Sequence, residues 1–261
     1  MGAVSIERQD RRIAVVRFDR GNKANALSRG LMAELTEAAR SLEDDDELSA
    51  VVLTGRADVF TLGADLKEPR PDPPPGLAAR RRLHTLGTKL TRAWAELEPM
   101  TIAAIEGWCV GGGAALAAAC DLRVMGEGAT IYVPEIERGM NLGWQSVPRL
   151  VNLVGPSRTK RIVILAEKIK AQRALDWGLV DELAPDGATL AKALEMAEQV
   201  AAMPPIQVRM CKEAINAAAT ALNAATSVMD RDVFLLAQGS ADYQEGVRAF
   251  LERRKPRYTG G

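Results

Sequence analysis

The sequence lacks an excess of charge of either sign, and it also lacks any long apolar run. Among its 261 residues, 34 lysines and arginines balance 34 aspartates and glutamates, so no surplus positive charge is left to neutralise a nucleic acid backbone. No stretch of about eighteen apolar residues occurs, as a membrane-spanning helix would need. Residues 1–10 also lack the basic and apolar segments of a secretion signal. We therefore expect a soluble, unexported protein that binds neither nucleic acid nor membrane.

Cysteine and the common catalytic motifs are equally scarce. Cys109, Cys120 and Cys211 lie in apolar, alanine-rich stretches without metal-ligand spacing, which favours a reducing cytoplasm and predicts no metal site. The sequence has no GxGxxG fingerprint, Walker A motif, GxSxG elbow or HExxH pair. A Rossmann dehydrogenase, a P-loop enzyme, an esterase and a zincin would each lack their defining residues.

What is present predicts an α/β protein. With 47% hydrophobic residues, the chain can bury the core of one large domain, alone or with a smaller appendage. Residues 13–18 and 50–53 resemble strands, and a helix after a Ser28 N-cap lies between them. Further on, the pattern predicts strands at 101–105, 122–125 and 130–133, a glycine-dense turn at 107–113 and a helix at 114–120.

The middle and the end of the chain are predicted to be mostly helical. Residues 69–76 hold five prolines, which predicts an exposed, mobile loop. One amphipathic helix is expected at 77–97, with the single histidine, His84, on its surface; a catalytic role for His84 is the less favoured alternative. Later helices are predicted at 157–166, 171–177, 188–203, 207–221 and 242–254.

Two glycine turns are candidates for an anion site. Residues 63–66 follow a strand-like segment and precede a possible helix, and residues 111–113 join a strand to a helix. Small residues let a ligand approach the main chain, and the first amides of a helix lack intrahelical acceptors. Each turn can therefore hold an oxyanion, although tight helix–sheet packing would select the same glycines.

Several segments, in their order and spacing, resemble the signatures of the crotonase (enoyl-CoA hydratase/isomerase) superfamily. They are FTLGADLKE at 60–68, TIAAIEGWCVGGGAALAAACDLRV at 101–124, YVPEIERGM at 132–140 and ALDWGLVDEL at 174–183, with NKANALS at 22–28 and AFLERRKP at 249–256 near the ends. The resemblance implies an α/β fold: a spiral of repeated ββα turns with the acyl-CoA site in residues 1–195, and a helical oligomerisation region in residues 196–261. It implies a homotrimer or homohexamer acting on an acyl-CoA thioester. No cofactor is expected, because coenzyme A enters as part of the substrate.

The resemblance also implies how catalysis would work. The thioester oxygen would lie between the backbone N–H groups of Ala64 and Gly112, donors that are worth about 3–4 kcal/mol each when charge develops on the oxygen. Typical hydratases of the family use two glutamates. One of them matches Glu135, whereas the other position is Ala115, which can neither hold water nor move a proton. Losing such a group costs about 10²- to 10⁴-fold in rate, so efficient two-glutamate hydration is not expected.

Substrate contacts are implied at positions in the matched motifs: Lys23, Ala24, Ala26, Asp65, Leu66, Lys67, Trp108, Gly111, Pro134, Trp144, Phe250 and Arg253. Lys67 and Arg253 match basic positions near coenzyme A phosphates, and a solvated surface role is equally open for both. Asp65 is expected to fix its turn rather than to act in catalysis. Trp144 departs from the family pattern; we favour an indole that fills space in the acyl pocket over one that stacks on an aromatic acyl group.

Three hypotheses follow for the function. The first is an enzyme that hydrates or isomerises an enoyl-CoA with Glu135 as its single proton carrier. The second, motivated by Ala115, is a weak or inactive acyl-CoA-binding protein, and the third is a thioester hydrolase. For Glu135 itself the alternative is purely structural, because a glutamate after proline is common in the first turn of a helix.

Overall fold

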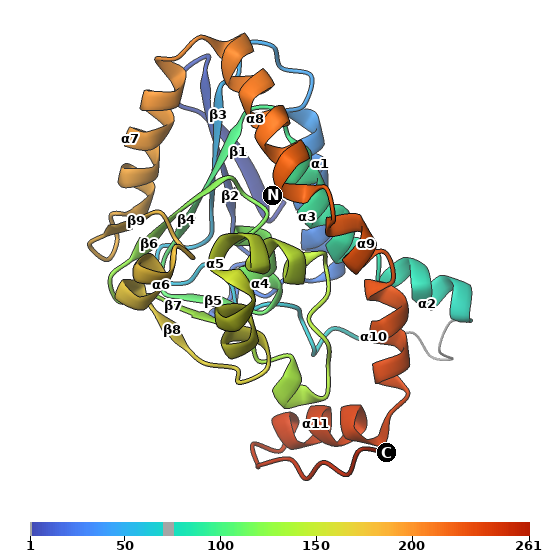
Figure 1. Cartoon of the computed structure of the whole chain (residues 1–261). Coiled ribbons are helices and arrows are strands. Elements are labelled where there is room, and N and C mark those ends of the chain that lie inside the picture. The colour runs from blue at the N-terminus through green and yellow to red at the C-terminus, as the bar shows by residue number, and fades with distance from the viewer. Residues whose placement is uncertain (1, 70–75) are drawn as a thin grey trace.

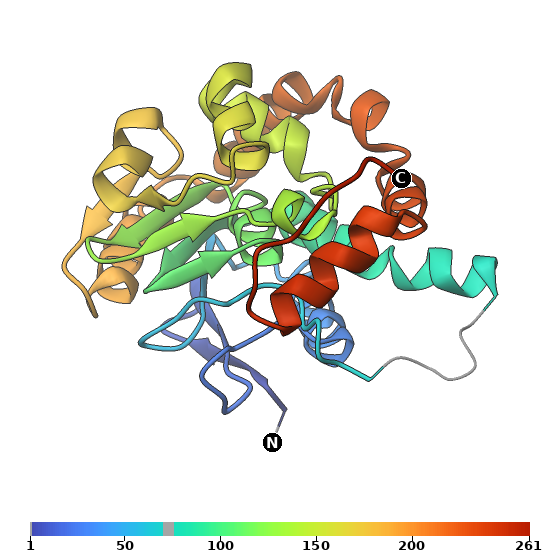
Figure 2. The same cartoon turned by 90° about the horizontal axis from the view of Figure 1, so that it is seen from below.

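The computed structural model describes residues 2–69 and 76–261, and these form a mixed α/β fold. The proline-rich loop predicted at 69–76 lies outside the described residues, except for its two ends. In the described part of the chain, the N-terminal half supplies most of the strands, and the part after residue 188 is mostly helical (Figures 1 and 2).

The larger sheet of the described chain has six strands in the order β1-β2-β3-β4-β6-β9. All neighbouring strands are parallel except β1 and β2. The central strands are apolar and buried on both faces, as parallel sheets require. The strands are β1 (Val4–Arg8), β2 (Ile13–Phe18), β3 (Ala50–Thr54), β4 (Met100–Ile105), β6 (Leu122–Gly126) and β9 (Glu182–Ala184).

A second, smaller sheet has three strands in the order β5-β7-β8. It contains β5 (Trp108–Val110), β7 (Thr130–Tyr132) and β8 (Ile169–Lys170), and an isolated bridge joins Thr61 to Cys109 of β5. After β3, β4 and β6 the chain thus adds a segment to the smaller sheet and then continues into helical structure. This is the repeated ββα order that the resemblance implies.

The two faces of the main sheet bury separate cores. Alternate side chains of β2 point to opposite faces: Ala14 and Val16 belong to one core, and Ile13 and Val15 to the other. Helices α1 (Arg29–Ser41) and α3 (Leu86–Glu96) pack on each other in the first core, and α7 (Thr189–Ala201) covers the second. The boundary predicted between residues 195 and 196 falls inside α7.

Some of the remaining helices follow strands of the two sheets, and α8 to α11 form the C-terminal end of the chain. These remaining helices are α2 (Leu77–Leu83), α4 (Gly112–Ala117), the 3₁₀ helix η1 (Ile136–Arg138), α5 (Ser146–Val163), α6 (Ala171–Trp177), α8 (Pro205–Thr220), α9 (Asn223–Ser227), α10 (Asp230–Gln238) and α11 (Ala241–Leu251). In Figure 1, α8 to α10 run down one side of the molecule, and α11 turns back beneath it. Helix α11 packs on η1 so closely that a methyl group at Gly246 would collide with the backbone of Arg138.

The single helix predicted at 77–97 is wrong. The helix stops at His84 and Thr85, and the two pieces pack on different partners. Helix α3 buries Leu90 and Trp94 in the core, whereas none of the described residues of α2 is buried. Instead, Arg81 of α2 pairs with Asp232 of α10. The helical spacing of apolar residues over 77–97 does not show that α2 and α3 pack against different parts of the protein.

Two predictions about the glycine turns also need correction. The turn predicted at 107–113 contains strand β5, and the turn at 63–66 is followed by further turn residues rather than by a helix. Other elements were missed: β1, β8, β9, η1, α9, α10 and the first half of α5. No helix in the described residues is long and apolar enough to cross a membrane.

Candidate active site

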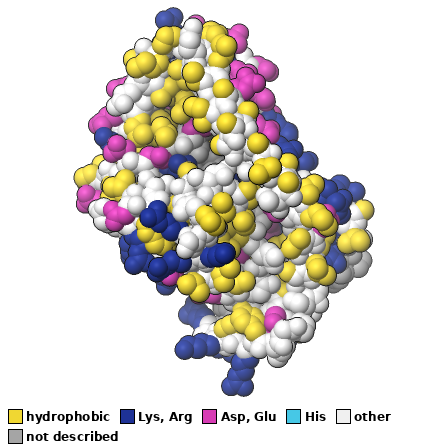
Figure 3. Space-filling model, viewed as in Figure 1, with side chains coloured by type: hydrophobic (Ala, Val, Ile, Leu, Met, Phe, Trp, Pro, Cys, Tyr) yellow, Lys and Arg dark blue, Asp and Glu magenta, His cyan; other side chains and the backbone are white. Residues whose placement is uncertain are grey.

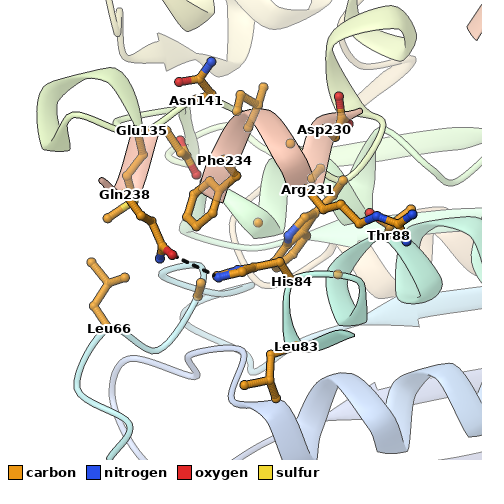
Figure 4. Close-up of a pocket in the computed structure, with 18 of the residues that line it drawn as sticks. Leu66, Leu83, His84, Thr88, Glu135, Asn141, Asp230, Arg231, Phe234 and Gln238 are labelled. Carbon is orange, nitrogen blue, oxygen red and sulfur yellow. Dashed lines mark hydrogen bonds between the residues drawn. The ribbon is translucent and has the colours of Figure 1, made fainter. Parts of the chain in front are cut away.

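The residues predicted to be catalytic meet at one cavity of about 530 Å³. Ala64, Gly112, Ala115, Glu135 and Trp144 all line it. They come from the loop after β3, from the start of α4, from the segment after β7 and from the loop before α5. The other wall consists of α2, α3 and α10 residues, several of which are labelled in Figure 4.

Main-chain contacts fix the backbone at Ala64, and Gly63 packs closely against the segment that precedes Gly112. Leu27 N donates to Gly63 O at 2.8 Å and Asp65 N donates to Leu27 O at 3.1 Å, which fixes the backbone on both sides of Ala64. Gly63 has φ of +85°, and a methyl group there would lie 2.6 Å from Val110 O. Only glycine therefore lets the first turn approach the second so closely.

Both proposed oxyanion donors are available. Gly112 is the first residue of α4, where amides have no intrahelical acceptor. No hydrogen bond from the Ala64 amide to another described residue is recorded, and Ala64 is exposed. The two amides therefore border the cavity as unused donors, and this is the arrangement that an oxyanion needs.

Glu135 directly precedes η1, and its side chain lines the cavity. Its carbonyl oxygen accepts from Arg138 N at 3.0 Å and Met140 N at 2.9 Å, which anchors the main chain. Its Oε1 lies so close to Gly111 that a side chain there would collide with it. Its Oε2 is buried and has no hydrogen-bond partner within the described residues.

Burial raises the pKa of Glu135 to about 7, although a hydrogen bond from its own backbone and the charge of Arg138 act in the opposite direction. A carboxyl group with a pKa near neutrality can accept and return a proton at physiological pH. This property, rather than the position after a proline, sets Glu135 apart from a structural helix-capping glutamate.

The other carboxylates that line the described part of the cavity have partners. Asp65 pairs with Arg20 at 2.7 Å, and although burial acts in the opposite direction, hydrogen bonds from Arg20 and the Lys67 amide lower the pKa of Asp65. Glu68 accepts from Arg29 N at 3.1 Å, and Asp230 accepts from Gln145 N at 2.8 Å. Glu135 is therefore the candidate for proton transfer.

Trp144 fills the space between two helices. Its indole lies against Gly87 of α3 and Gly112 of α4, and a methyl group on either glycine would overlap the ring. Its backbone has φ of +61°, and its carbonyl accepts from Thr91 Oγ1 at 2.8 Å and Arg149 Nη1 at 3.0 Å. The packing agrees with the space-filling interpretation of this residue.

The predicted substrate contacts divide into two groups. Asp65, Leu66 and Trp144 line the cavity together with the catalytic positions. Nine others do not line it: Lys23, Ala24, Ala26, Lys67, Trp108, Gly111, Pro134, Phe250 and Arg253. Phe250 stacks under Arg138, 4.3 Å from its guanidinium carbon, and Lys168 lies over the Trp108 ring. Substrate binding by these nine stays a prediction.

The wall formed by α10 was missed, and His84, between α2 and α3, contacts it. His84 Nε2 lies 3.1 Å from Gln238 Oε1, and its ring lies 4.9 Å from that of Phe234 (Figure 4). His84 lines the cavity, and its preferred interpretation as an inert residue stays a prediction. No motif marks residues 230–238, so only tertiary structure could bring them here.

This chain is similar to known proteins along nearly its whole length. A profile described as enoyl-CoA hydratase/isomerase matches residues 8–261. The chain is 32% identical over 263 residues to the 2,3-dehydroadipyl-CoA hydratase of Escherichia coli (strain K12), covering 100% of both proteins. It is 31% identical over 245 residues to the short-chain-enoyl-CoA hydratase of Clostridium acetobutylicum, covering 94% of this chain and 93% of the relative.

Solved structures also match along nearly the whole chain. The crystal structure of an enoyl-CoA hydratase/isomerase from Xanthobacter autotrophicus Py2 has a TM-score of 0.87 and 28% identity, and the match covers 99% of each chain. An enoyl-CoA hydratase from Mycobacterium avium subsp. paratuberculosis K-10 matches with a TM-score of 0.87 over 99% of each chain, at 23% identity.

Proposed function

Because this chain belongs to the enoyl-CoA hydratase/isomerase family, we propose that it adds water to an enoyl-CoA thioester with Glu135 as its single acid/base group. The observation that carries the proposal is the Glu135 carboxylate, with one buried oxygen lacking a partner in the described residues and a pKa raised by burial to about 7. The amides of Ala64 and Gly112 border the same cavity and serve as the oxyanion donors.

The proposed hydration uses these groups in two proton transfers. The oxygen of water bonds to C3 of the enoyl group while the double-bond electrons move toward the carbonyl, and the two amides stabilise the enolate oxygen. Glu135 takes the proton that water loses and delivers it to C2, which restores the carboxylate. Water is added across the double bond, and no oxidant or reductant is consumed.

Double-bond isomerisation is the second candidate, and Ala115 favours it. This residue lines the cavity and is only 2% exposed, so the position offers a methyl group where a typical hydratase would hold water. One carboxylate is sufficient for isomerisation, since it can remove a proton from C2 of a 3-enoyl thioester and return it to C4. The enolate between these steps would use the same two amides.

An acyl-CoA-binding protein without turnover is less well supported. Such a protein has no need to keep a carboxylate in a desolvated position, because an ionised group without a partner costs stability. The same holds for two main-chain donors left free of acceptors. Ala115 alone therefore does not outweigh the intact arrangement around Glu135.

A product screen in deuterated water tests these alternatives. Purified protein would be incubated with matched 2-enoyl and 3-enoyl thioesters, aliphatic and aromatic, and the products analysed by mass spectrometry. We expect water addition that falls about 10²- to 10⁴-fold in Glu135→Gln. Bond migration or deuterium exchange without water addition would indicate an isomerase instead, and release of free coenzyme A would indicate a hydrolase. Tight acyl-CoA binding with no reaction would contradict both enzyme proposals.

We also propose that the C-terminal helices assemble the protein into a trimer, or a hexamer built from trimers. Large apolar side chains are exposed along α8, α9 and α10, and Figure 3 shows them gathered on the face that these helices present. They include Ile206, Met210, Ile215, Leu222, Val228, Met229 and Leu236, each more than half exposed. Several large exposed apolar side chains on one face are typical of a protein–protein interface.

A further inference from the structure

The cavity wall formed by α10 contains a cation with an unsatisfied donor. Arg231 lines the cavity, and its Nε is buried without a hydrogen-bond partner within residues 2–69 and 76–261. Its nearest recorded carboxylate oxygen, Asp232 Oδ2, is 3.8 Å away, beyond hydrogen-bond distance. A buried guanidinium N–H without an acceptor costs free energy, and in a cavity wall it is placed to donate to a bound ligand.

The acidic residues near Arg231 are already used by other groups. Asp232 receives two hydrogen bonds from Arg81, at 2.5 and 2.9 Å. Asp230 accepts from the Gln145 amide, and burial raises its pKa although that hydrogen bond and the charge of Arg149 act in the opposite direction. Arg231 therefore has only a long ion pair to Asp232, a carboxylate that Arg81 already occupies with two hydrogen bonds.

The position of Arg231 suits the far end of an acyl group. Figure 4 shows Glu135 and the guanidinium of Arg231 on opposite sides of Phe234, with the guanidinium directed toward Thr88 of α3. Phe234 lies between these two ends (Figure 4), and Leu142 and Trp144 also line the cavity, together with the polar His84 and Gln238. A thioester held at Glu135 would therefore extend its acyl chain along apolar side chains toward a positive charge.

We propose that Arg231 binds a carboxylate at the end of the acyl group, so that the preferred substrates are mono-thioesters of unsaturated dicarboxylic acids. This inference rests on the proposed function, which places the thioester at Glu135. The planar guanidinium fork matches the two oxygens of a carboxylate, and the apolar side chains of the cavity fit the methylene groups that join the two ends.

Binding of unreactive ligands tests the inference without relying on turnover. Calorimetry would compare the saturated thioesters hexanedioyl-CoA and hexanoyl-CoA, which have the same chain length and differ only in the terminal carboxylate. We expect the wild-type chain to bind hexanedioyl-CoA at least about tenfold more tightly, the effect of one charge-assisted hydrogen bond. Arg231→Met should remove this preference while leaving hexanoyl-CoA affinity within about threefold, and Arg231→Lys should keep part of it.

A matched control and a turnover assay complete the test. Arg92→Met removes an arginine of α3 that pairs with Glu96 and does not line the cavity, so it should keep the full preference. Equal affinity of the wild-type chain for both ligands would overturn the inference. So would an Arg231→Met variant whose affinity for both ligands falls by the same factor.

Turnover of trans-2-hexenedioyl-CoA and trans-2-hexenoyl-CoA separates the two proposals. A binding preference without turnover refutes only the proposed reaction, and turnover without a preference refutes only the role of Arg231.

Discussion

At the scale of single residues, the site depends on one carboxyl group placed where the protein can hardly solvate it. Glu135 is anchored through its main chain, while its side chain lies against the backbone of Gly111. The absence of a β-carbon at Gly111, whose φ is +53°, makes this contact possible. The result is a group whose pKa of about 7 suits proton transfer and whose charged form is costly to bury.

This cost predicts how stability depends on pH. The folded-state pKa of Glu135, about 7, lies above the usual value of 4.5, so the folded protein holds its proton more tightly than the unfolded chain does. The resulting stabilisation is complete below pH 4.5 and is lost as the pH rises through 7. Glu135→Gln, which keeps the shape without the charge, should therefore be more stable than the wild type by about 3 kcal/mol at pH 8.

Denaturant unfolding at pH 5 and at pH 8 would measure the difference. The stability gain of Glu135→Gln should shrink to a small fraction at pH 5, where the wild-type carboxyl is mostly protonated in the folded state. Glu37→Gln is a suitable control, since Glu37 is exposed in α1. An equal gain at both pH values, or none at pH 8, would contradict the burial of a chargeable Glu135.

Sequence motifs identified this residue, but they could not describe its surroundings. Ala64, Gly112 and Glu135 occur in recognisable segments, and all three line the cavity. His84, Arg231 and Phe234 were missed or misplaced, because nothing in their local sequence separates them from ordinary surface positions. Their place in the site depends on how α10 packs over α2 and α3, and that contact joins residues about 150 positions apart.

At the scale of elements, the buried strands were predictable and the partly exposed elements were not. Strands β2 and β3 are largely apolar, and their predicted limits agree with the structure within one residue. Strand β1 is mostly exposed at the edge of the sheet, so its side chains give little apolar signal. Helix α5 bends at Gly155, where φ is +75°, and the prediction found only the part after this bend.

The contact between α3 and the Trp144 loop gives an element-scale prediction. In a helix interior, Gly→Ala normally stabilises by about 1 kcal/mol. At Gly87, however, the added methyl group would overlap the indole of Trp144, and such overpacking costs about 1–3 kcal/mol. Gly87→Ala should therefore destabilise the wild type but stabilise a Trp144→Ala protein.

A double-mutant cycle of unfolding free energies, at one protein concentration, checks this coupling. Gly30→Ala in α1 is the control, because a methyl group there meets only Ser28 Oγ, at 3.9 Å. Its effect should be the same with and without Trp144. If Gly87→Ala also behaves alike in both backgrounds, the indole does not fill the space between α3 and α4.

At the scale of the whole molecule, the chain combines a covered sheet with C-terminal helices that remain partly uncovered. Helix α7 buries Ala193 and Ala197 on the sheet, whereas α8 buries only Lys212 among its described residues. Lys212 pairs with Asp121 and donates to Leu97 O and Pro99 O, so a buried ion pair and two hydrogen bonds attach α8 to the core. The apolar residues of α8 and α9 then face outward.

These outward residues predict that assembly depends on α8 and α9. Met210 is 63% exposed and Leu222 is 76% exposed, so neither can contribute much to the fold of a single chain. In an oligomer they would be desolvated, and a carboxylate placed there without a partner would strongly oppose association. The double variant Met210→Glu/Leu222→Glu should therefore shift the mass measured by light scattering from a multiple of three chains to one chain of 28.1 kDa, while circular dichroism stays unchanged.

Ile6→Glu, on the exposed side of β1, should leave the mass unaltered, because that residue lies on the edge strand of the sheet rather than on the C-terminal helices. A wild-type chain that is monomeric at micromolar concentration, or a double variant that keeps the wild-type mass, would show that these side chains do not form the interface.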